Sequence, residues 1–247
     1  MAIIERFEVE EIDYSLKYPF VTSLREVTSL RTVSVVINDR FRGDAVESAA
    51  ITGDSYEVIK KELIYLQSKL IGLDTQDDFS DLPVTNSAKS AIDCACADAN
   101  GALPPLTEVK TDVTIPIANL EELKDIVRLR LVDGFRAFKI KLHNENLTAI
   151  VDKLKLIKEL ASDTKLRLDP NQSWTPEFCI LVLNELDKNR IPIDYIEQPV
   201  NRFDYAGLAT IRKNVSIPVM ADESCFSMDD LLQLLDHNSI DIVNLKY

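Results

Sequence analysis

The stretch Lys165–Asn171, KLRLDPN, decides the fold because its layout recurs along the second half of the chain. It is a short apolar run with a charged side chain, Asp169, near its end. Comparable apolar or β-branched runs occupy residues 111–117, 136–142, 194–199, 218–224 and 240–246, and helical patterns lie between them. Alternation of strands and helices repeated this often predicts a parallel sheet with helical crossovers. Two α/β architectures satisfy this pattern, a doubly wound sheet and a (β/α) barrel.

Charged side chains at the ends of the runs distinguish these two architectures. They recur every 24 to 28 residues along the chain, at Lys141, Asp169, Glu197, Asp222 and Lys246. The carboxyl ends of barrel strands share one mouth, where catalytic groups gather, whereas an open sheet spreads the same groups along a crevice. We therefore predict a (β/α) barrel with five charged side chains at its mouth.

The residue types at these positions indicate a reaction. Carboxylates on three neighbouring strands (Asp169, Glu197 and Asp222) form an oxygen-ligand set that suits Mg²⁺. Lys141 and Lys246 lie on the strands that flank this set, on opposite sides. Removal of a proton next to a carboxylate produces an enolate, which a divalent cation stabilises. Two opposed lysines can remove a proton from one face of a carbon and return one to the other face, which inverts the stereocentre.

Lys139 is predicted to lie beside Lys141 and to lower the pKa of its amine. Residues two apart in a strand face the same way, so Lys139 and Lys141 share one face. A lysine base must be neutral, and a nearby cation lowers the pKa of its amine.

The first part of the chain has a different organisation. Residues 3–12 and 32–37 are β-rich, and residues 55–71 and 86–100 have helical patterns. Residues 101–107, with two adjacent prolines, form the predicted linker. We expect an α+β domain over residues 1–110 and a barrel over residues 111–247.

Composition excludes several classes of function. The net charge is −13 with no basic cluster, which disfavours nucleic-acid binding. The six glycines form none of the usual phosphate-binding loops. The sequence shows neither a signal peptide nor an apolar run long enough for a membrane span, so we expect a cytoplasmic protein with no membrane partner.

The strand-end motifs resemble those of the muconate-lactonising subgroup of the enolase superfamily. They are FKIK at 138–141, LRLDPNQSW at 166–174, YIEQPV at 195–200, PVMADESCFS at 218–227 and IDIVNLK at 240–246. The resemblance implies an α+β capping domain with a modified barrel, Mg²⁺ as cofactor, and lysines that act as acid and base. The implied metal ligands are Asp169, Glu197 and Asp222, the implied acid/base residues are Lys141 and Lys246, and Glu223 lies beside the metal ligands. Lys139 and Asn171 are the implied substrate contacts from the barrel.

Three further motifs resemble those of dipeptide epimerases, which are isomerases. They are TDVTIPI at 111–117, PFVTSLREVTS at 19–29 and ITGDS at 51–55. Arg25 falls where the family's arginine holds the side-chain carboxylate of the substrate, a role that suits a guanidinium. The implied function is Mg²⁺-dependent epimerisation of a dipeptide such as L-Ala-L-Glu by a homo-oligomer, as is common among these relatives.

The sequence also departs from the family pattern. The segment before the first barrel strand is short, and the chain stops at Tyr247, one residue after Lys246. We therefore expect an incomplete barrel of about six strands, truncated at its C-terminus. Two alternatives stay open: an o-succinylbenzoate synthase or N-acylamino-acid racemase of the same superfamily, and an inactive remnant or a domain completed by a partner chain.

Overall fold

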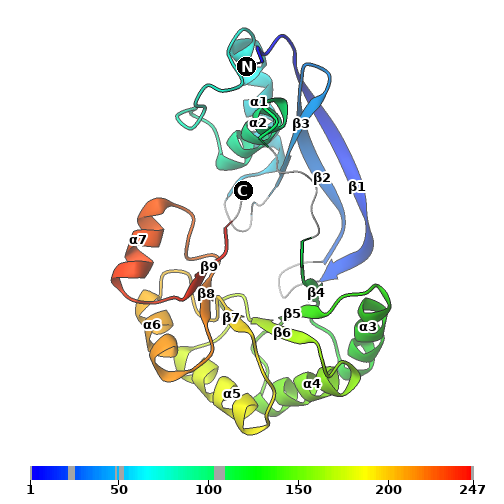
Figure 1. Ribbon diagram of the computed structural model, residues 1–247, viewed down its shortest axis with the longest axis vertical. Helices are drawn as coiled ribbons and strands as arrows, with labels where there is room; N and C mark the ends of the chain where they lie inside the picture. The colour runs from blue at the N-terminus through cyan, green and yellow to red at the C-terminus, as the bar shows by residue number, and fades with distance from the viewer. Residues whose placement is uncertain (1, 22–25, 48, 50–52, 103–108, 246–247) are drawn as a thin grey trace. The chain divides into compact units, whose positions relative to one another are not determined.

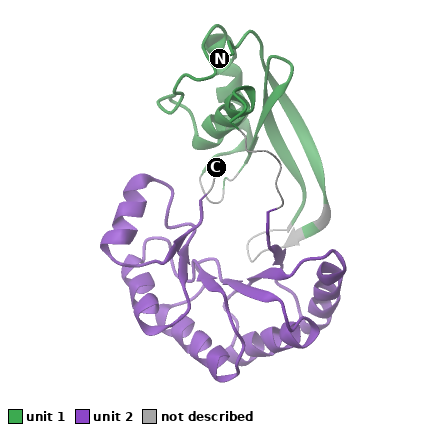
Figure 2. Ribbon diagram, in the orientation of Figure 1, with its two compact units in different colours: residues 1–20, 26–108, 247 green, residues 21–25, 109–246 purple. Residues whose placement is uncertain are grey.

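The computed structural model describes residues 2–21, 26–47, 49, 53–102 and 109–245 (Figure 1). The chain divides into two compact units, one built mainly from residues 2–102 and the other mainly from residues 109–245 (Figure 2). Arg25 and Lys246 lie outside the described residues.

The first unit is a three-stranded sheet with two helices. The strands are β1 (Phe7–Val21), β2 (Glu26–Ile37) and β3 (Phe41–Val46), and the sheet order is β1-β2-β3. Strands β2 and β3 pair antiparallel through a tight turn at Asn38 and Asp39, both of which have positive φ, as such hairpin turns require. Helices α1 (Tyr56–Leu70) and α2 (Asn86–Ala99) bury their apolar sides with residues of β2, among them Val33, Val35 and Ile37.

Strand β3 was not predicted, because its buried positions carry little hydrophobic signal. Its exposed and buried residues alternate, but the fully buried positions are Gly43 and Ala45. The small side chains let α2 lie directly on the strand. A Cβ added at Gly43 would lie 1.9 Å from the main-chain oxygen of Ala91 and 2.8 Å from the nitrogen of Ala95.

We expect Gly43→Ala to destabilise the first unit by about 3 kcal/mol, the upper part of the usual cost of overpacking a core. The added methyl group meets helix backbone, which cannot rotate away. The free energy of unfolding in urea measures the loss. Arg42→Ala, at the neighbouring exposed position, is the control and should change stability by less than about 1 kcal/mol. Equal losses in the two variants would contradict the close approach.

The second unit is a curved six-stranded parallel sheet with helices around its outer side (Figure 1). The strands are β4 (Val113–Ile115), β5 (Ala137–Lys141), β6 (Lys165–Asp169), β7 (Tyr195–Glu197), β8 (Val219–Ala221) and β9 (Ile242–Val243), paired in chain order. The helices are α3 (Leu120–Val132), α4 (Leu147–Leu160), α5 (Pro176–Lys188), α6 (Tyr205–Asn214) and α7 (Met228–Asp236). This confirms the predicted α/β fold class with six parallel strands. Within the described residues, no helix is both long and apolar enough to cross a membrane.

The alternation of side chains along the strands separates the core from the site. Phe138 and Ile140 of β5, like Leu168 of β6, are buried in the apolar core that the helices complete. Lys139 and Lys141, which alternate with them in β5, therefore point to the inner side of the curved sheet. Because side chains alternate between the two faces of a strand, the apolar residues of β5 enter the core and both lysines lie inside the partial barrel.

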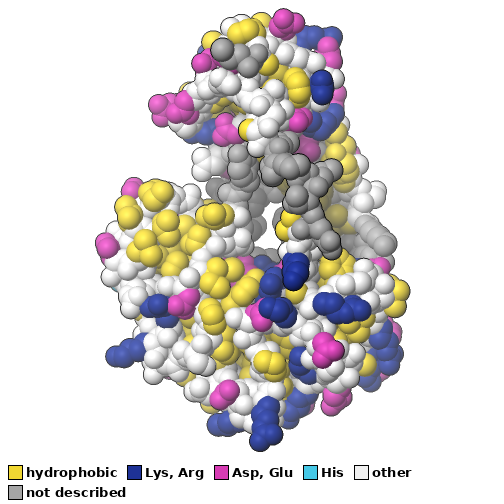
Figure 3. Space-filling view, in the orientation of Figure 1, with side chains coloured by type: hydrophobic (Ala, Val, Ile, Leu, Met, Phe, Trp, Pro, Cys, Tyr) yellow, Lys and Arg dark blue, Asp and Glu magenta, His cyan; other side chains and the backbone are white. Residues whose placement is uncertain are grey.

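Helix α7 carries an exposed apolar stripe. Met228, Leu232 and Leu235 are spaced to share one side of the helix and are 52–68% exposed. Hydrophobic side chains gather over α7 in Figure 3.

Candidate active site

The predicted site residues follow the carboxyl ends of neighbouring strands. Lys141 and Asp169 are register partners at the ends of β5 and β6. Glu197 ends β7, and Asp222 follows β8 directly. The parallel register therefore gathers these side chains at one edge of the sheet.

Two lysines contact two carboxylates at this edge, and we call Lys139, Lys141, Asp169 and Glu197 the lysine–carboxylate cluster. The Lys139 Nζ donates to Glu197 Oε1 at 2.6 Å and lies 3.0 Å from Asp169 Oδ2. The Lys141 Nζ donates to the same Asp169 Oδ2 and to Asn171 Oδ1, each at 2.6 Å. Asp169 is therefore shared by both amines.

Burial makes these charges strongly interdependent. Asp169 and Glu197 are at most 1% exposed. Burial, followed by repulsion from Asp169, raises the pKa of Glu197 above that of an ordinary carboxyl, although Lys139 opposes the shift. Burial alone would lower the pKa of Lys139, but attraction to Asp169 and Glu197 outweighs burial and raises it. The two carboxylates therefore favour the protonated form of Lys139, which contacts both of them.

A second group of contacts lies beside the cluster. The Asn171 Nδ2 donates to Glu223 Oε1 at 3.1 Å, and the Asn171 main-chain N donates to Asp169 Oδ1 at 3.0 Å. Burial, and then the charge of Asp222, raise the pKa of Glu223. The structure thus links Asn171 and Glu223 to Lys141, while Asp222 is buried and close enough to influence Glu223 electrostatically.

Two residues of the site were missed by sequence reasoning. Asn244 comes just after β9, and its Nδ2 donates to Glu197 Oε1 at 3.3 Å. Gln198 is fully buried with a left-handed backbone, and its Oε1 accepts from the main-chain nitrogens of Asp222 and Ser224, each at 3.0 Å. Asn244 stands two residues before Lys246 in the motif NLK, a same-face spacing that could have signalled it.

We expect Gln198→Leu to reduce the free energy of unfolding by about 2–4 kcal/mol, because it leaves two buried main-chain N–H groups without acceptors. Urea unfolding measures this loss. Gln172→Leu is the matched control, because Gln172 also has a positive φ but its Oε1 accepts from only one main-chain nitrogen, that of Arg202. Equal losses would assign the effect to backbone strain.

The charges of this edge would suit a divalent cation such as Mg²⁺. Four carboxyl groups are buried there (Asp169, Glu197, Asp222 and Glu223), and two described lysines accompany them. If all are ionised, two negative charges are left, which a divalent cation would balance. Glu223 Oε2 is buried and has no hydrogen-bond partner among the residues that the structure describes. Within the described residues, however, no three Asp, Glu, His or Cys side chains stand together as a ready set of ligands, and lysine amines lie among the carboxylates instead.

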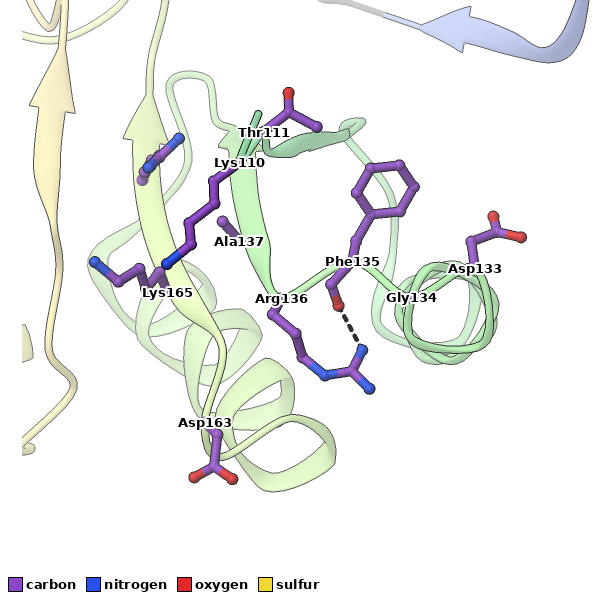
Figure 4. Close-up of a pocket in the computed structure, with 10 residues that line it drawn as sticks. Lys110, Thr111, Asp133, Gly134, Phe135, Arg136, Ala137, Asp163 and Lys165 are labelled. Atoms are coloured by element: carbon purple, nitrogen blue, oxygen red, sulfur yellow. Dashed lines mark hydrogen bonds between the residues drawn. The ribbon is translucent and has the colours of Figure 1, made fainter. Parts of the chain in front are cut away.

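A separate cavity of about 590 Å³ lies at the opposite ends of β5 and β6 (Figure 4). Two of its cations already have partners. The Arg167 Nη1 lies 2.6 Å from Asp112 Oδ2, and the Arg136 Nη1 donates to the main-chain oxygen of Phe135 at 2.7 Å. Catalytic groups of parallel barrels gather at the carboxyl ends of the strands, so we place the chemistry at the lysine–carboxylate cluster.

Comparisons with known proteins identify the family of the chain. Residues 121–247 match the family described as Enolase C-terminal domain-like. The L-Ala-D/L-Glu epimerase of Clostridium acetobutylicum is 32% identical over 270 residues, which cover 99% of this chain and 74% of that protein.

Solved structures of dipeptide epimerases have the same fold. The substrate-liganded L-Ala-D/L-Glu epimerase of Bacillus subtilis superposes with a TM-score of 0.87 at 27% identity, over 98% of this chain and 74% of that one. The dipeptide epimerase of Enterococcus faecalis, complexed with Mg and L-Leu-L-Tyr, superposes with a TM-score of 0.87 at 28% identity, over 99% of this chain and 75% of that one. The chain belongs to the enolase superfamily, and dipeptide epimerases, which are isomerases, are its relatives.

Proposed function

We propose that this chain catalyses the Mg²⁺-dependent epimerisation of a dipeptide such as L-Ala-L-Glu at the α-carbon of its C-terminal residue. The observation that carries the proposal is the buried contact of Lys141 with Asp169 and Asn171, beside the Lys139–Glu197 pair. In this proposal, residues 1–110 form the capping domain and residues 111–247 the barrel.

The lysines perform the proton transfers. Lys141, in its neutral form, removes the α-proton from one face of the substrate, and Lys246 delivers a proton to the other face. In the reverse direction, the two lysines exchange roles. The Lys139 ammonium supplies positive charge where negative charge grows on the substrate carboxylate.

The carboxylates hold the cofactor. Asp169, Glu197 and Asp222 are the proposed Mg²⁺ ligands, because their oxygens are the hard donors that this ion prefers. When bound, Mg²⁺ stabilises the negative charge that proton abstraction creates. Asn171 and Lys139 are proposed to contact the substrate from the barrel, and Arg25 to hold its side-chain carboxylate.

Deuterium exchange tests the proposal. Purified protein is incubated with L-Ala-L-Glu and Mg²⁺ in D₂O, and ¹H NMR follows the α-proton of the glutamate residue. We expect this proton to be replaced by deuterium and L-Ala-D-Glu to appear. Exchange should require Mg²⁺ and should stop when EDTA is added.

Other outcomes distinguish the alternatives. Turnover of N-succinyl amino acids without dipeptide exchange would identify an N-acylamino-acid racemase, and dehydration of a cyclohexadiene acid would identify an o-succinylbenzoate synthase. A folded protein inactive on all these substrates would be a remnant or a domain that needs a partner chain.

Calorimetric titration with Mg²⁺ tests the cofactor independently of turnover. We expect one Mg²⁺ site that Glu197→Gln weakens, because the substitution removes a charged ligand. Glu185→Gln, at a half-buried position of α5 outside the cluster, is the control and should leave the titration unchanged. Equal affinities in the two variants would remove Glu197 from the site.

The remaining expectations concern partners and location. We propose that the protein works in the cytoplasm as a homo-oligomer, without nucleic-acid or membrane partners. Sedimentation analysis of the purified chain tests the oligomeric state.

A further inference from the structure

Asn171 connects two groups of opposite hydrogen-bonding character. On one side it accepts from the Lys141 Nζ at 2.6 Å, and on the other it donates to Glu223 Oε1 at 3.1 Å. A lysine amine offers N–H donors, whereas an ionised carboxylate only accepts. The side-chain amide must therefore turn its Nδ2 toward Glu223 and its Oδ1 toward Lys141.

The backbone keeps Asn171 in this place. Its φ is +46°, a left-handed conformation that asparagine adopts more easily than most residues. Its main-chain N donates to Asp169 Oδ1 at 3.0 Å. The side-chain amide is held at Oδ1 by Lys141 and at Nδ2 by Glu223.

The contacts of the Lys141 amine determine the direction of its lone pair. A neutral amine has two N–H bonds and one lone pair. If Asp169 Oδ2 and Asn171 Oδ1 accept the two N–H bonds, each at 2.6 Å, the lone pair is directed away from both acceptors. A base that removes a carbon-bound proton needs its lone pair in such a fixed direction.

We infer that Glu223 is a positioning residue for Lys141 and acts through the side-chain amide of Asn171. The inference rests on the proposed function, in which Lys141 is one of two bases. Loss of the Glu223 acceptor would let the amide rotate and present its Nδ2 to the lysine, which removes one of the two acceptors that orient the amine.

A pair of substitutions separates hydrogen bonding from charge. Glu223→Gln removes the charge but keeps an oxygen that can accept from Asn171, whereas Glu223→Leu removes both. We expect Glu223→Leu to slow deuterium exchange of the epimer that depends on Lys141 by about 10- to 100-fold. Exchange of the opposite epimer should change by less than about threefold relative to Glu223→Gln, because its base is Lys246.

Two further variants complete the series. Asn171→Gly keeps the left-handed backbone without strain and removes the amide, so exchange of the epimer that depends on Lys141 should fall at least as far as in Glu223→Leu. Because Asn171 is also a proposed substrate contact, this variant is judged by that rate alone. Ser224→Ala is the matched control, because Ser224 lies in the same buried segment but bonds to Gln198 and Arg202 instead. Equal slowing of exchange of both epimers in Glu223→Leu would overturn the inference. Equal losses of exchange in Glu223→Gln and Glu223→Leu would overturn it too.

NMR provides a readout that does not depend on turnover. The side-chain amide signals of Asn171 should shift in Lys141→Met and in Glu223→Leu, and should stay in place in Ser224→Ala. Unchanged signals in Lys141→Met would overturn the inference. Absence of exchange in the unmodified protein would reject the proposed function, whereas the amide signals would still decide the role of Glu223.

Discussion

Lys141→Met should abolish epimerisation and lower α-proton exchange of one dipeptide epimer by about 10²- to 10⁴-fold, the usual contribution of a positioned general base. Methionine keeps most of the length of the side chain but has no proton-accepting nitrogen. The other epimer should still exchange its α-proton with retention of configuration, because its proposed base is Lys246. Separate NMR assays in D₂O, each starting from one pure epimer, measure the two rates.

Lys153→Met is the matched control for this substitution. Lys153 is also a largely buried lysine paired with a carboxylate, Glu145, but it lies on α4, outside the cluster. It should leave both exchange rates near those of the unmodified protein. Equal slowing of both epimers in Lys141→Met, with the protein still folded, would contradict a mechanism with one base on each face.

The largest expected loss of stability follows from Lys139→Met, which should lower the free energy of unfolding by about 3–5 kcal/mol in EDTA. The substitution leaves Glu197, 1% exposed, without its ammonium partner and next to Asp169. Mg²⁺ should restore part of the loss, because a ligand that binds only the folded state stabilises it. Urea unfolding with and without Mg²⁺ measures both effects.

An exposed lysine provides the comparison. Lys124 pairs with Glu121 on the surface of α3, and Lys124→Met should cost less than about 1 kcal/mol. If Lys139→Met cost no more than Lys124→Met in EDTA, the buried Glu197 would not depend on the ammonium.

The sequence predicted the parallel sheet because its strands carry a strong hydrophobic signal. The apolar residues of β5 and β6 alternate with charged ones, and the same charged residues occupy the strand ends. β3 was missed because its inward positions, Gly43 and Ala45, contribute space for a helix and almost no apolar surface. Packing of this kind depends on the partner helix and leaves no periodic pattern.

The residue types of the site could be predicted from the sequence. Most of the contacts between them could not. Spacing identified Lys141, Asp169 and Glu197, which the sheet register brings to one edge. The role of Gln198 depends on a left-handed backbone that turns its amide toward the segment after β8. Neither this conformation nor the orientation of the Asn171 amide follows from strand spacing.

The contacts of the site join residues that are far apart along the chain. The two partners of Lys141 lie 28 and 30 residues away, the Asn171–Glu223 bond spans 52 residues and the Lys139–Glu197 bond spans 58. Contacts between distant residues carry a large loop-closure cost and form slowly during folding. We therefore expect helices of the second unit to form before the lysine amines of the cluster meet their acceptors, and the contacts of the site to be completed late in folding.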